Sequence, residues 1–205
     1  MNAICLVVDR LQAGYLGCYG NRWVQTPELD RLAAESFVFD QAIIDTPELP
    51  GLYRAWWYLR HACESATGLA AESSLPGLLA AHDIRMALVT DDAALLASLP
   101  AELLECVEVR LVESRPATMP AGDSRQAHLH HVFDAALAWL ESGTSPFLLW
   151  VHIGSLAQVW DAPHEIRELY RAEDDPESAR DVEVPRFVLS ANYDPDQLQA
   201  VMQAY

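Results

Sequence analysis

The sequence predicts an α/β fold in which a mostly parallel sheet is flanked by helices on both faces. Short apolar runs, such as 3–8 and 146–152, are almost free of polar residues and are typical of strands buried on both faces. Segments with helical periodicity lie between such runs, and 124–140 is the clearest of them. Alternating strands and helices favour a parallel sheet, because each crossover places a helix on one of its faces.

Four strands and one further extended segment are expected. Three strands are nearly free of polar residues, whereas the remaining one is weaker because Glu108 and Arg110 interrupt it. The expected strands are 3–8, 85–89, 106–112 and 146–152, and the extended segment is 37–44.

The expected helices are recognised by their start signals and apolar stripes. The first begins well, since Thr26 can cap it, Pro27 suits its first position and Glu28 its first turn. The helices are the segment after Thr26, then 52–63, 75–81, 124–140 and the segment that begins at Asp194-Pro195-Asp196. The expected stripes are Leu29, Leu32 and Ala33 in the first helix and Leu129, Phe133, Ala136, Leu137 and Leu140 in the fourth. Segments 113–123 and 172–184 are expected to be surface loops.

Composition limits the classes of function. With 205 residues, 51% of them hydrophobic, the chain can bury a core as a single domain over 1–205. A net charge of −17 argues against binding to nucleic acid or to an anionic membrane surface. No apolar run approaches the roughly 18 residues of a membrane span. The start runs directly into a strand without a secretory signal, so a cytoplasmic location is expected.

The four cysteines are expected to be free thiols. Cys5, Cys18, Cys63 and Cys106 are scattered, without a C-x-x-C pair or a short-spaced histidine partner. This pattern argues against a zinc site.

The segment 4–54 resembles the amino-terminal part of the sulfatases, which belong to the alkaline-phosphatase superfamily. The similarity is carried by ICLVVDR, by GYLGCYGNRWVQTPELDRLAAESFVFDQA and by DTPELPGLYR. The resemblance implies a sulfatase-like α/β fold, metal-dependent hydrolysis of sulfuric esters, and calcium as the divalent cation. It extends over most of this chain but only about the first half of the family domain, so the domain is expected to be incomplete at its carboxyl end.

The metal site of the family is only partly retained. Asp9 matches the first of two adjacent aspartates that bind the metal in sulfatases, and it stands at the carboxyl end of a strand, where sites are built. Arg10 replaces the second aspartate. A guanidinium at this position repels a cation and can pair with Asp9 instead, so a capping or ion-paired Asp9 is the alternative to a metal ligand.

The nucleophile of the family is lost. Sulfatases read C/S-x-P-S-R, and the Cys or Ser position falls on Leu49 or on Pro50, depending on the direction of counting. Neither side chain can attack sulfur. Arg54 matches the arginine that steadies the nucleophile, and we expect it to remain as a packed or surface residue of an aromatic helix.

The sulfate-binding positions have changed as well. Asp91 and Ala93 replace a lysine and a histidine of the family, and Ala157 replaces a second histidine. Asp91-Asp92 is interpreted as a helix cap rather than a metal pair. His152 matches a common family histidine that is not a sulfate ligand, and burial at a strand end is expected for it.

Two further clusters are interpreted as structural. His128 and His131 lie three residues apart, beside His130, which can suit a metal, but an exposed polar helix face is the favoured interpretation. The aromatic run 56–58 can bind a sugar ring, yet core packing is the default.

Three hypotheses follow. The first is a sulfatase-like protein whose catalysis is impaired or lost, which binds a sulfated or phosphorylated small molecule or pairs with another chain. The second is an active sulfate or phosphate ester hydrolase with a rearranged site around Asp9, Asp91, Asp92 and His152. The third is a non-catalytic interaction module that associates with itself or with a partner chain through uncovered strands.

Overall fold

The computed structural model describes residues 2–64, 68, 70–113, 117–143, 145–185 and 193–205, which form two compact units. Unit 1 comprises Met1–Val7, Ala42–Glu113 and Val132–Ile153. Unit 2 comprises Val8–Gln41, Ser114–His131 and Gly154–Tyr205. The expectation of one domain over 1–205 stays a prediction.

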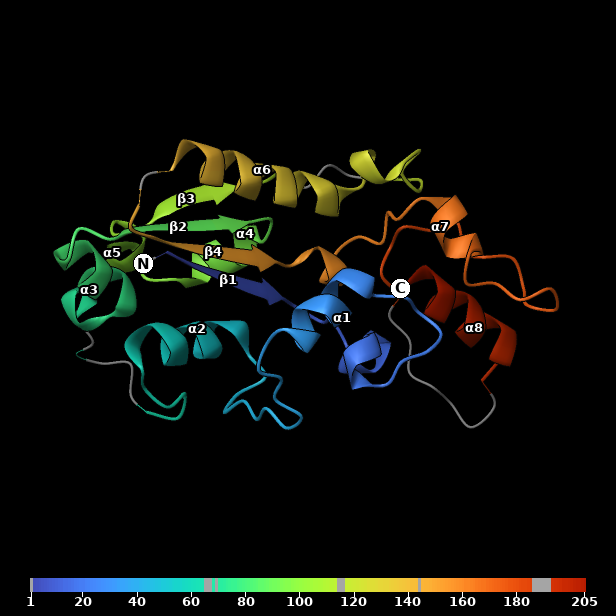
Figure 1. Ribbon diagram of the computed structural model, residues 1–205, viewed down its shortest axis with the longest axis horizontal. Helices are drawn as coiled ribbons and strands as arrows, with labels where there is room; N and C mark the ends of the chain where they lie inside the picture. The colour runs from blue at the N-terminus through green and yellow to red at the C-terminus, as the bar shows by residue number, and fades with distance from the viewer. Residues whose placement is uncertain (1, 65–67, 69, 114–116, 144, 186–192) are drawn as a thin grey trace. The chain divides into compact units, whose positions relative to one another are not determined.

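Unit 1 contains a four-stranded sheet in the order β1-β4-β2-β3. Strand β2 is parallel to both neighbours, with Leu88 opposite Val109 on one side and Trp150 on the other. The arrows in Figure 1 point the same way, as expected for an all-parallel sheet. The strands are β1 (Ala3–Val8), β2 (Arg85–Thr90), β3 (Glu108–Leu111) and β4 (Phe147–Ile153). The predicted parallel α/β sheet is therefore confirmed.

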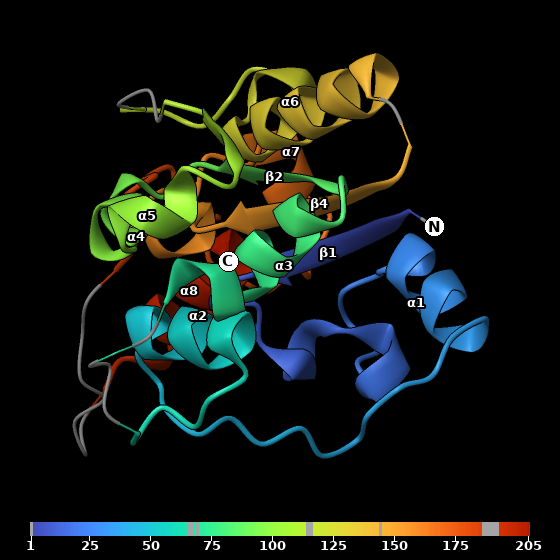
Figure 2. The same cartoon turned by 90° about the vertical axis from the view of Figure 1, so that its left-hand side faces the viewer.

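Helices cover the two faces of this sheet. Figure 2 shows α2 below the strands and α6 above them. The helices of unit 1 are α2 (Leu49–Tyr58), α3 (Leu75–Ala81), α4 (Ala93–Ser98), α5 (Ala101–Leu104) and, from Val132 onward, α6 (His128–Ser142). Side chains alternate between the faces of a strand, so Leu88 and Trp150 point towards α2, where Tyr53 and Trp57 complete a buried core. On the other face, Trp139 of α6 packs edge-on against Phe147 with 5.3 Å between ring centroids.

The orientation of α6 differs from the expectation by about one residue. Val132, Ala136 and Trp139 are its buried residues in unit 1, whereas Phe133 and Leu137 are exposed. Trp139 decides the orientation, because its ring also lies under the guanidinium of Arg85, 5.2 Å from the ring centroid.

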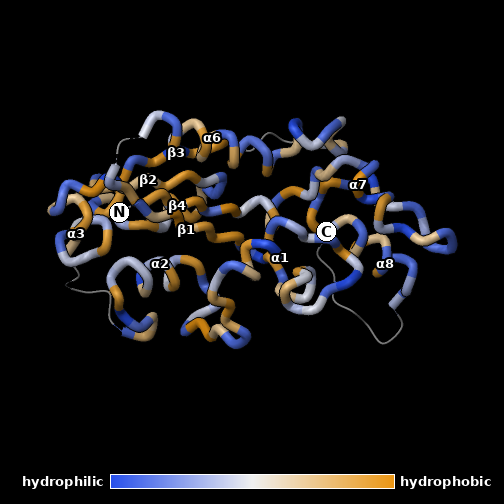
Figure 3. The backbone as a smooth tube through the Cα atoms, viewed as in Figure 1, coloured by the Kyte–Doolittle hydropathy of each residue, from blue (hydrophilic) through white to orange (hydrophobic). Residues whose placement is uncertain are grey.

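Strand β1 is an edge strand with one uncovered face. Cys5 and Val7 pack against the α2 core, but Ile4 and Leu6 on the other face are 59% and 46% exposed. Figure 3 shows how apolar this strand is. The expectation of burial on both faces is therefore wrong for β1, since no described element of unit 1 covers its second face.

Unit 2 consists of short helices joined by loops. Its helices are α1 (Pro27–Ala34), α7 (His164–Glu168) and α8 (Pro195–Ala204), with 3-10 turns at Ala13–Tyr15, Gly17–Tyr19, Ser124–Gln126 and Ser155–Ala157. Arg167 organises the loops around α7, because its buried guanidinium donates hydrogen bonds to the carbonyls of Trp160, Ala162, Ala179 and Asp181.

Three local expectations need correction. Thr26 does not cap α1 with its side chain; its hydroxyl instead accepts a hydrogen bond from the amide of Gly17 at 2.9 Å. The stripe of α1 is not buried, and Leu32 is 60% exposed. Segment 37–44 forms no strand, and Ile43 is 95% exposed, because no neighbouring strand pairs with it. Among the described residues, no helix is long and apolar enough to cross a membrane.

Candidate functional site

The positions that match the sulfatase nucleophile lie at the start of α2. Leu49 and Pro50 are its first two residues, and Glu48 is the residue before them. A helix start is a favourable place for an anion, because its free amides and dipole point outward. Here the side chains are hydrocarbon and the preceding carboxylate repels an anion, so these two positions supply no nucleophile.

Arg54 is tied to a neighbouring loop. It is half-buried and donates a hydrogen bond from Nη2 to the carbonyl oxygen of Ala62. The Ala62 amide in turn donates to Asp45 Oδ2 at 2.7 Å. This hydrogen bond lowers the pKa of Asp45, and the charges of His61 and Arg54 lower it further. Arg54 therefore ties helix α2 to this loop, and its half-buried position in an aromatic helix agrees with the expectation of a packed or surface residue.

A cavity of about 870 Å³ in unit 1 brings Pro50 and Arg54 to the same place. Its rim carries three exposed carboxylates, from Glu72, Glu102 and Glu105. Burial raises the pKa of Tyr58 in its wall, and the charges of Glu102 and Glu72 raise it further. One arginine and three glutamates line this cavity, so its net charge opposes a sulfate or phosphate ester.

The carboxyl ends of β2 and β4 place Asp91, Asp92 and His152 near one another. Asp92 caps α4 by accepting a hydrogen bond from the Leu95 amide at 2.9 Å, which confirms the predicted cap. His152 is completely buried, with Nε2 3.8 Å from Asp92 Oδ2 and its ring 5.6 Å from that of Tyr53. Its burial at a strand end agrees with the prediction.

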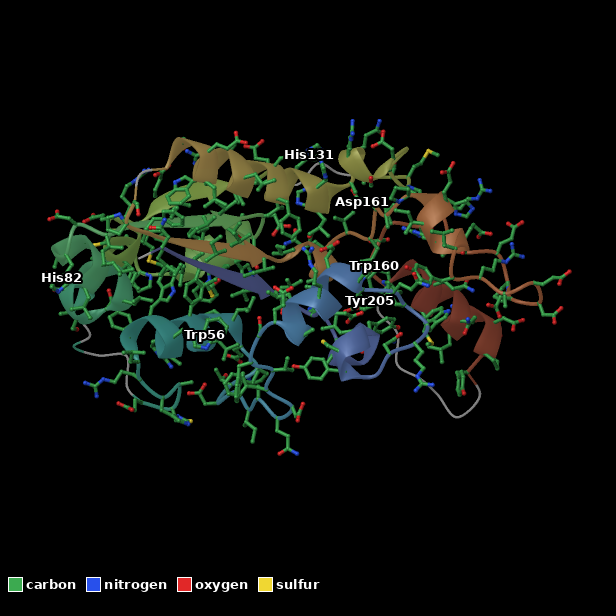
Figure 4. The ribbon with its side chains drawn as sticks, viewed as in Figure 1. Trp56, His82, His131, Trp160, Asp161 and Tyr205 are labelled. Carbon is green, nitrogen blue, oxygen red and sulfur yellow. The ribbon has the colours of Figure 1, made fainter. Side chains whose placement is uncertain are left out.

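The aromatic residues of α2 belong to the core. Tyr53 and Trp57 are fully buried and pack edge-on, with ring centroids 5.2 Å apart. Trp150 Nε1 donates to the Tyr53 hydroxyl at 3.0 Å. Trp56 is partly buried beside them, so this run packs rather than presenting a platform for a sugar (Figure 4).

Asp9 and Arg10, both in unit 2, form an ion pair. Such a pair is the alternative to metal binding that we derived from the sequence. Arg10 Nε lies 3.9 Å from Asp9 Oδ2, and the Arg10 side chain is 66% exposed. Arg10 has a φ of 62°, a left-handed conformation that is uncommon for residues with a side chain. Its carbonyl accepts a hydrogen bond from the hydroxyl of Tyr205. Ala157 ends a 3-10 turn in the same unit and offers no ligand atom in its side chain.

The side chains that the structure describes do not fit a divalent-cation site. Within the described ranges, no group of three or more His, Cys, Asp or Glu side chains converges so that it could hold a metal ion. His128 is buried rather than exposed, and its backbone amide donates to Asp161 Oδ2 at 2.8 Å. A hard cation such as calcium takes six to eight oxygen ligands, which neither Asp9 nor the Asp91-Asp92 pair supplies.

Sequence reasoning missed the carboxylates of the unit 1 cavity. Glu72, Glu102 and Glu105 are separated by up to 33 positions and lie in no motif. Only the packing of the segments around α2 brings them together, so no local signal could have identified them. The role of Tyr205 as a partner of Arg10 was missed for the same reason.

Comparisons with known proteins agree with the resemblance in the sequence. No family model matches the chain. A segment of 46 residues, 22% of this chain, is 44% identical to steryl-sulfatase of Rattus norvegicus and of Mus musculus, where it covers 8% and 7% of those proteins.

A solved structure shares the fold. It is the C-terminal periplasmic domain of EcEptC from Escherichia coli, in complex with Zn, with a TM-score of 0.63 and 12% identity. The match covers 99% of this chain and 54% of that one. This chain therefore contains a short segment similar to steryl-sulfatases and shares the α/β fold of this solved domain, of which it spans about half.

Proposed function

We propose that this sulfatase-like chain is impaired in, or has lost, the hydrolysis of sulfuric esters. The observation that carries the proposal is the start of α2, where Leu49 and Pro50 occupy the nucleophile position. Removal of a nucleophile from an enzyme that depends on one lowers kcat by about 10⁶-fold. The acidic rim of the neighbouring cavity supports the same conclusion, because it opposes the approach of an anionic ester.

Turnover of 4-methylumbelliferyl sulfate and phosphate tests this proposal. We expect no hydrolysis by the chain above that of a His152→Asn variant purified in parallel, with calcium, magnesium or manganese added. The variant controls for contaminating hydrolases, because such enzymes copurify with both proteins.

Metal-dependent turnover that both Asp9→Asn and His152→Asn abolish would overturn the proposal. It would support the alternative, an active hydrolase with a rearranged site. The proximity of His152 to Asp92, 3.8 Å between Nε2 and Oδ2, is the observation that favours this alternative. In this alternative the bound cation would be calcium, which the family resemblance implies, and Asp9 is the first ligand to test.

A second candidate function is association through β1 with a second copy or a partner chain. The edge position of β1 and the exposure of Ile4 and Leu6 favour it, because an uncovered apolar edge strand pairs readily with another strand. A cytoplasmic location stays a prediction, and the solved domain that shares the fold is periplasmic.

A further inference from the structure

A small aromatic cavity in unit 2 lies beside Arg10. It has a volume of about 280 Å³ and is separate from the residues that match the sulfatase nucleophile. Its apolar walls come from two turns and from helix α8. The lining residues used below are Arg10, Tyr15, Trp160, Leu198, Val201 and Tyr205, which together define the Arg10 cavity.

Three aromatic rings form one wall of the Arg10 cavity. The ring of Tyr205 lies 4.6 Å from that of Tyr15 and 5.3 Å from that of Trp160, measured between centroids. Figure 4 shows Trp160 and Tyr205 next to each other. The indole Nε1 of Trp160 is already bonded to the Leu156 carbonyl at 2.8 Å, so the ring is held in place. The planes of Tyr15 and Trp160 are inclined to that of Tyr205 by 57° and 73°, so a planar apolar group can pack on the face of one ring and against the edge of another.

Arg10 is the cation at the rim of this cavity. Its backbone is left-handed, and the turn is held by Tyr205, whose hydroxyl donates to the Arg10 carbonyl and accepts from the Gln12 amide at 3.0 Å. An uncommon backbone conformation that neighbouring contacts hold in place often marks a binding site. The planar guanidinium is suited to a carboxylate or sulfonate, which it can bind through two parallel hydrogen bonds.

Asp9 is the competitor for this guanidinium. The Arg10–Asp9 separation of 3.9 Å and the exposure of Arg10 make it a weak ion pair that a ligand can displace. The residue that replaces a metal-binding aspartate of the family therefore stands where it can bind an anion.

We infer that the Arg10 cavity binds a small molecule with a single planar ring and one anionic group, with the ring against Tyr15, Trp160 and Tyr205 and the anion on Arg10. The volume, just below the usual range for ligand pockets, matches one ring with a substituent. The net charge of −17 disfavours non-specific anion binding elsewhere, so saturable binding of an anion is informative.

The test compares 4-toluenesulfonate with its neutral isostere 4-toluenesulfonamide on the full chain by isothermal titration and ligand-observed NMR. We expect millimolar or tighter binding of the sulfonate and about fivefold weaker binding of the sulfonamide. Arg10→Asn should remove this preference while keeping the left-handed backbone, which asparagine tolerates. Arg125→Gln, an exposed arginine of the same unit, is the matched control and should change nothing.

Two further variants test the role of Asp9 and of the apolar part of the Arg10 cavity separately. Asp9→Asn should tighten sulfonate binding two- to fivefold by removing the competitor, whereas a metal-ligand role for Asp9 predicts no gain. Val201→Phe should block the apolar part of the Arg10 cavity and weaken both probes. Equal affinity for the two probes, insensitivity to Arg10→Asn, or no saturable binding would each overturn the inference. The Arg10→Asn and Val201→Phe results do not bear on the hydrolysis assay, because the Arg10 cavity contains neither Leu49 nor Pro50.

Discussion

At the scale of residues, the side chains of α2 determine how the core of unit 1 packs. At the start of α2, hydrocarbon side chains stand where the family resemblance places the nucleophile. Nearby, the hydroxyl of Tyr53 is used for packing, since it accepts the indole hydrogen bond of Trp150 inside the core. The Tyr53 hydroxyl therefore supports the packing of this core.

Tyr53→Phe should lower the free energy of unfolding by about 1–3 kcal/mol, because it leaves the buried Nε1 of Trp150 without its acceptor. Urea denaturation monitored by circular dichroism measures the change. Tyr58 lies in the same helix but is only half-buried, so Tyr58→Phe should lower the free energy of unfolding by less. Equal effects of the two substitutions would mean that the Trp150–Tyr53 hydrogen bond contributes nothing specific.

At the scale of elements, α7 is anchored to its loops by charged side chains. Glu168 accepts hydrogen bonds from Arg171 at 3.1 Å and from the Ser178 amide at 3.2 Å. Hydrogen bonding to Ser178, followed by Arg171, lowers the pKa of Glu168 to about 2. A carboxyl whose pKa is lowered by folding stabilises the folded state above its ordinary pKa and loses this effect as the pH falls towards its folded pKa.

Glu168→Gln should therefore destabilise the protein at pH 7, and the difference from the unmodified chain should shrink as the pH falls from about 5 to about 2. Urea midpoints at pH 7, 4 and 2.5 measure it. Glu165→Gln, an exposed neighbour in α7, should show no such pH dependence. A difference that stays constant with pH would contradict the contribution of the Glu168 carboxylate.

At the scale of the whole molecule, the main feature to explain is the exposed apolar face of strand β1. The chain matches 54% of the solved domain that shares its fold, and β1 is an edge strand with Ile4 and Leu6 exposed. Parallel strands are usually buried on both faces. A strand of this kind is therefore expected to be covered in the native assembly.

We expect the amides of residues 4–7 to exchange slowly in protein isolated from its source and faster in the 22.8 kDa chain alone. Leu6→Lys should remove that protection, whereas Leu78→Lys, at a similarly exposed position in α3, should not. Intact mass and sedimentation identify what covers β1. A native monomer of 22.8 kDa with rapid exchange in β1 would contradict the expectation.

Local signals in the sequence were sufficient for most of the elements. The helix at 75–81 and the strands at 85–89 and 146–152 agree with α3, β2 and β4 to within one or two residues. Asp92 and Asp194 both cap helices through their side chains. Such features depend on neighbouring residues only, namely apolar periodicity, a capping carboxylate and a proline at a helix start.

The sequence by itself determined the α/β class, the parallel strands, and the hydrocarbon side chains of Leu49 and Pro50, where the sulfatase resemblance implies a nucleophile. Tertiary structure alone decided which face of α6 is buried, which face of β1 is open, and how Glu72, Glu102 and Glu105 gather around one cavity. It also placed Tyr205 against Arg10. The physical reason is that these features depend on contacts between residues far apart in the chain, which are set by packing and not by local propensity.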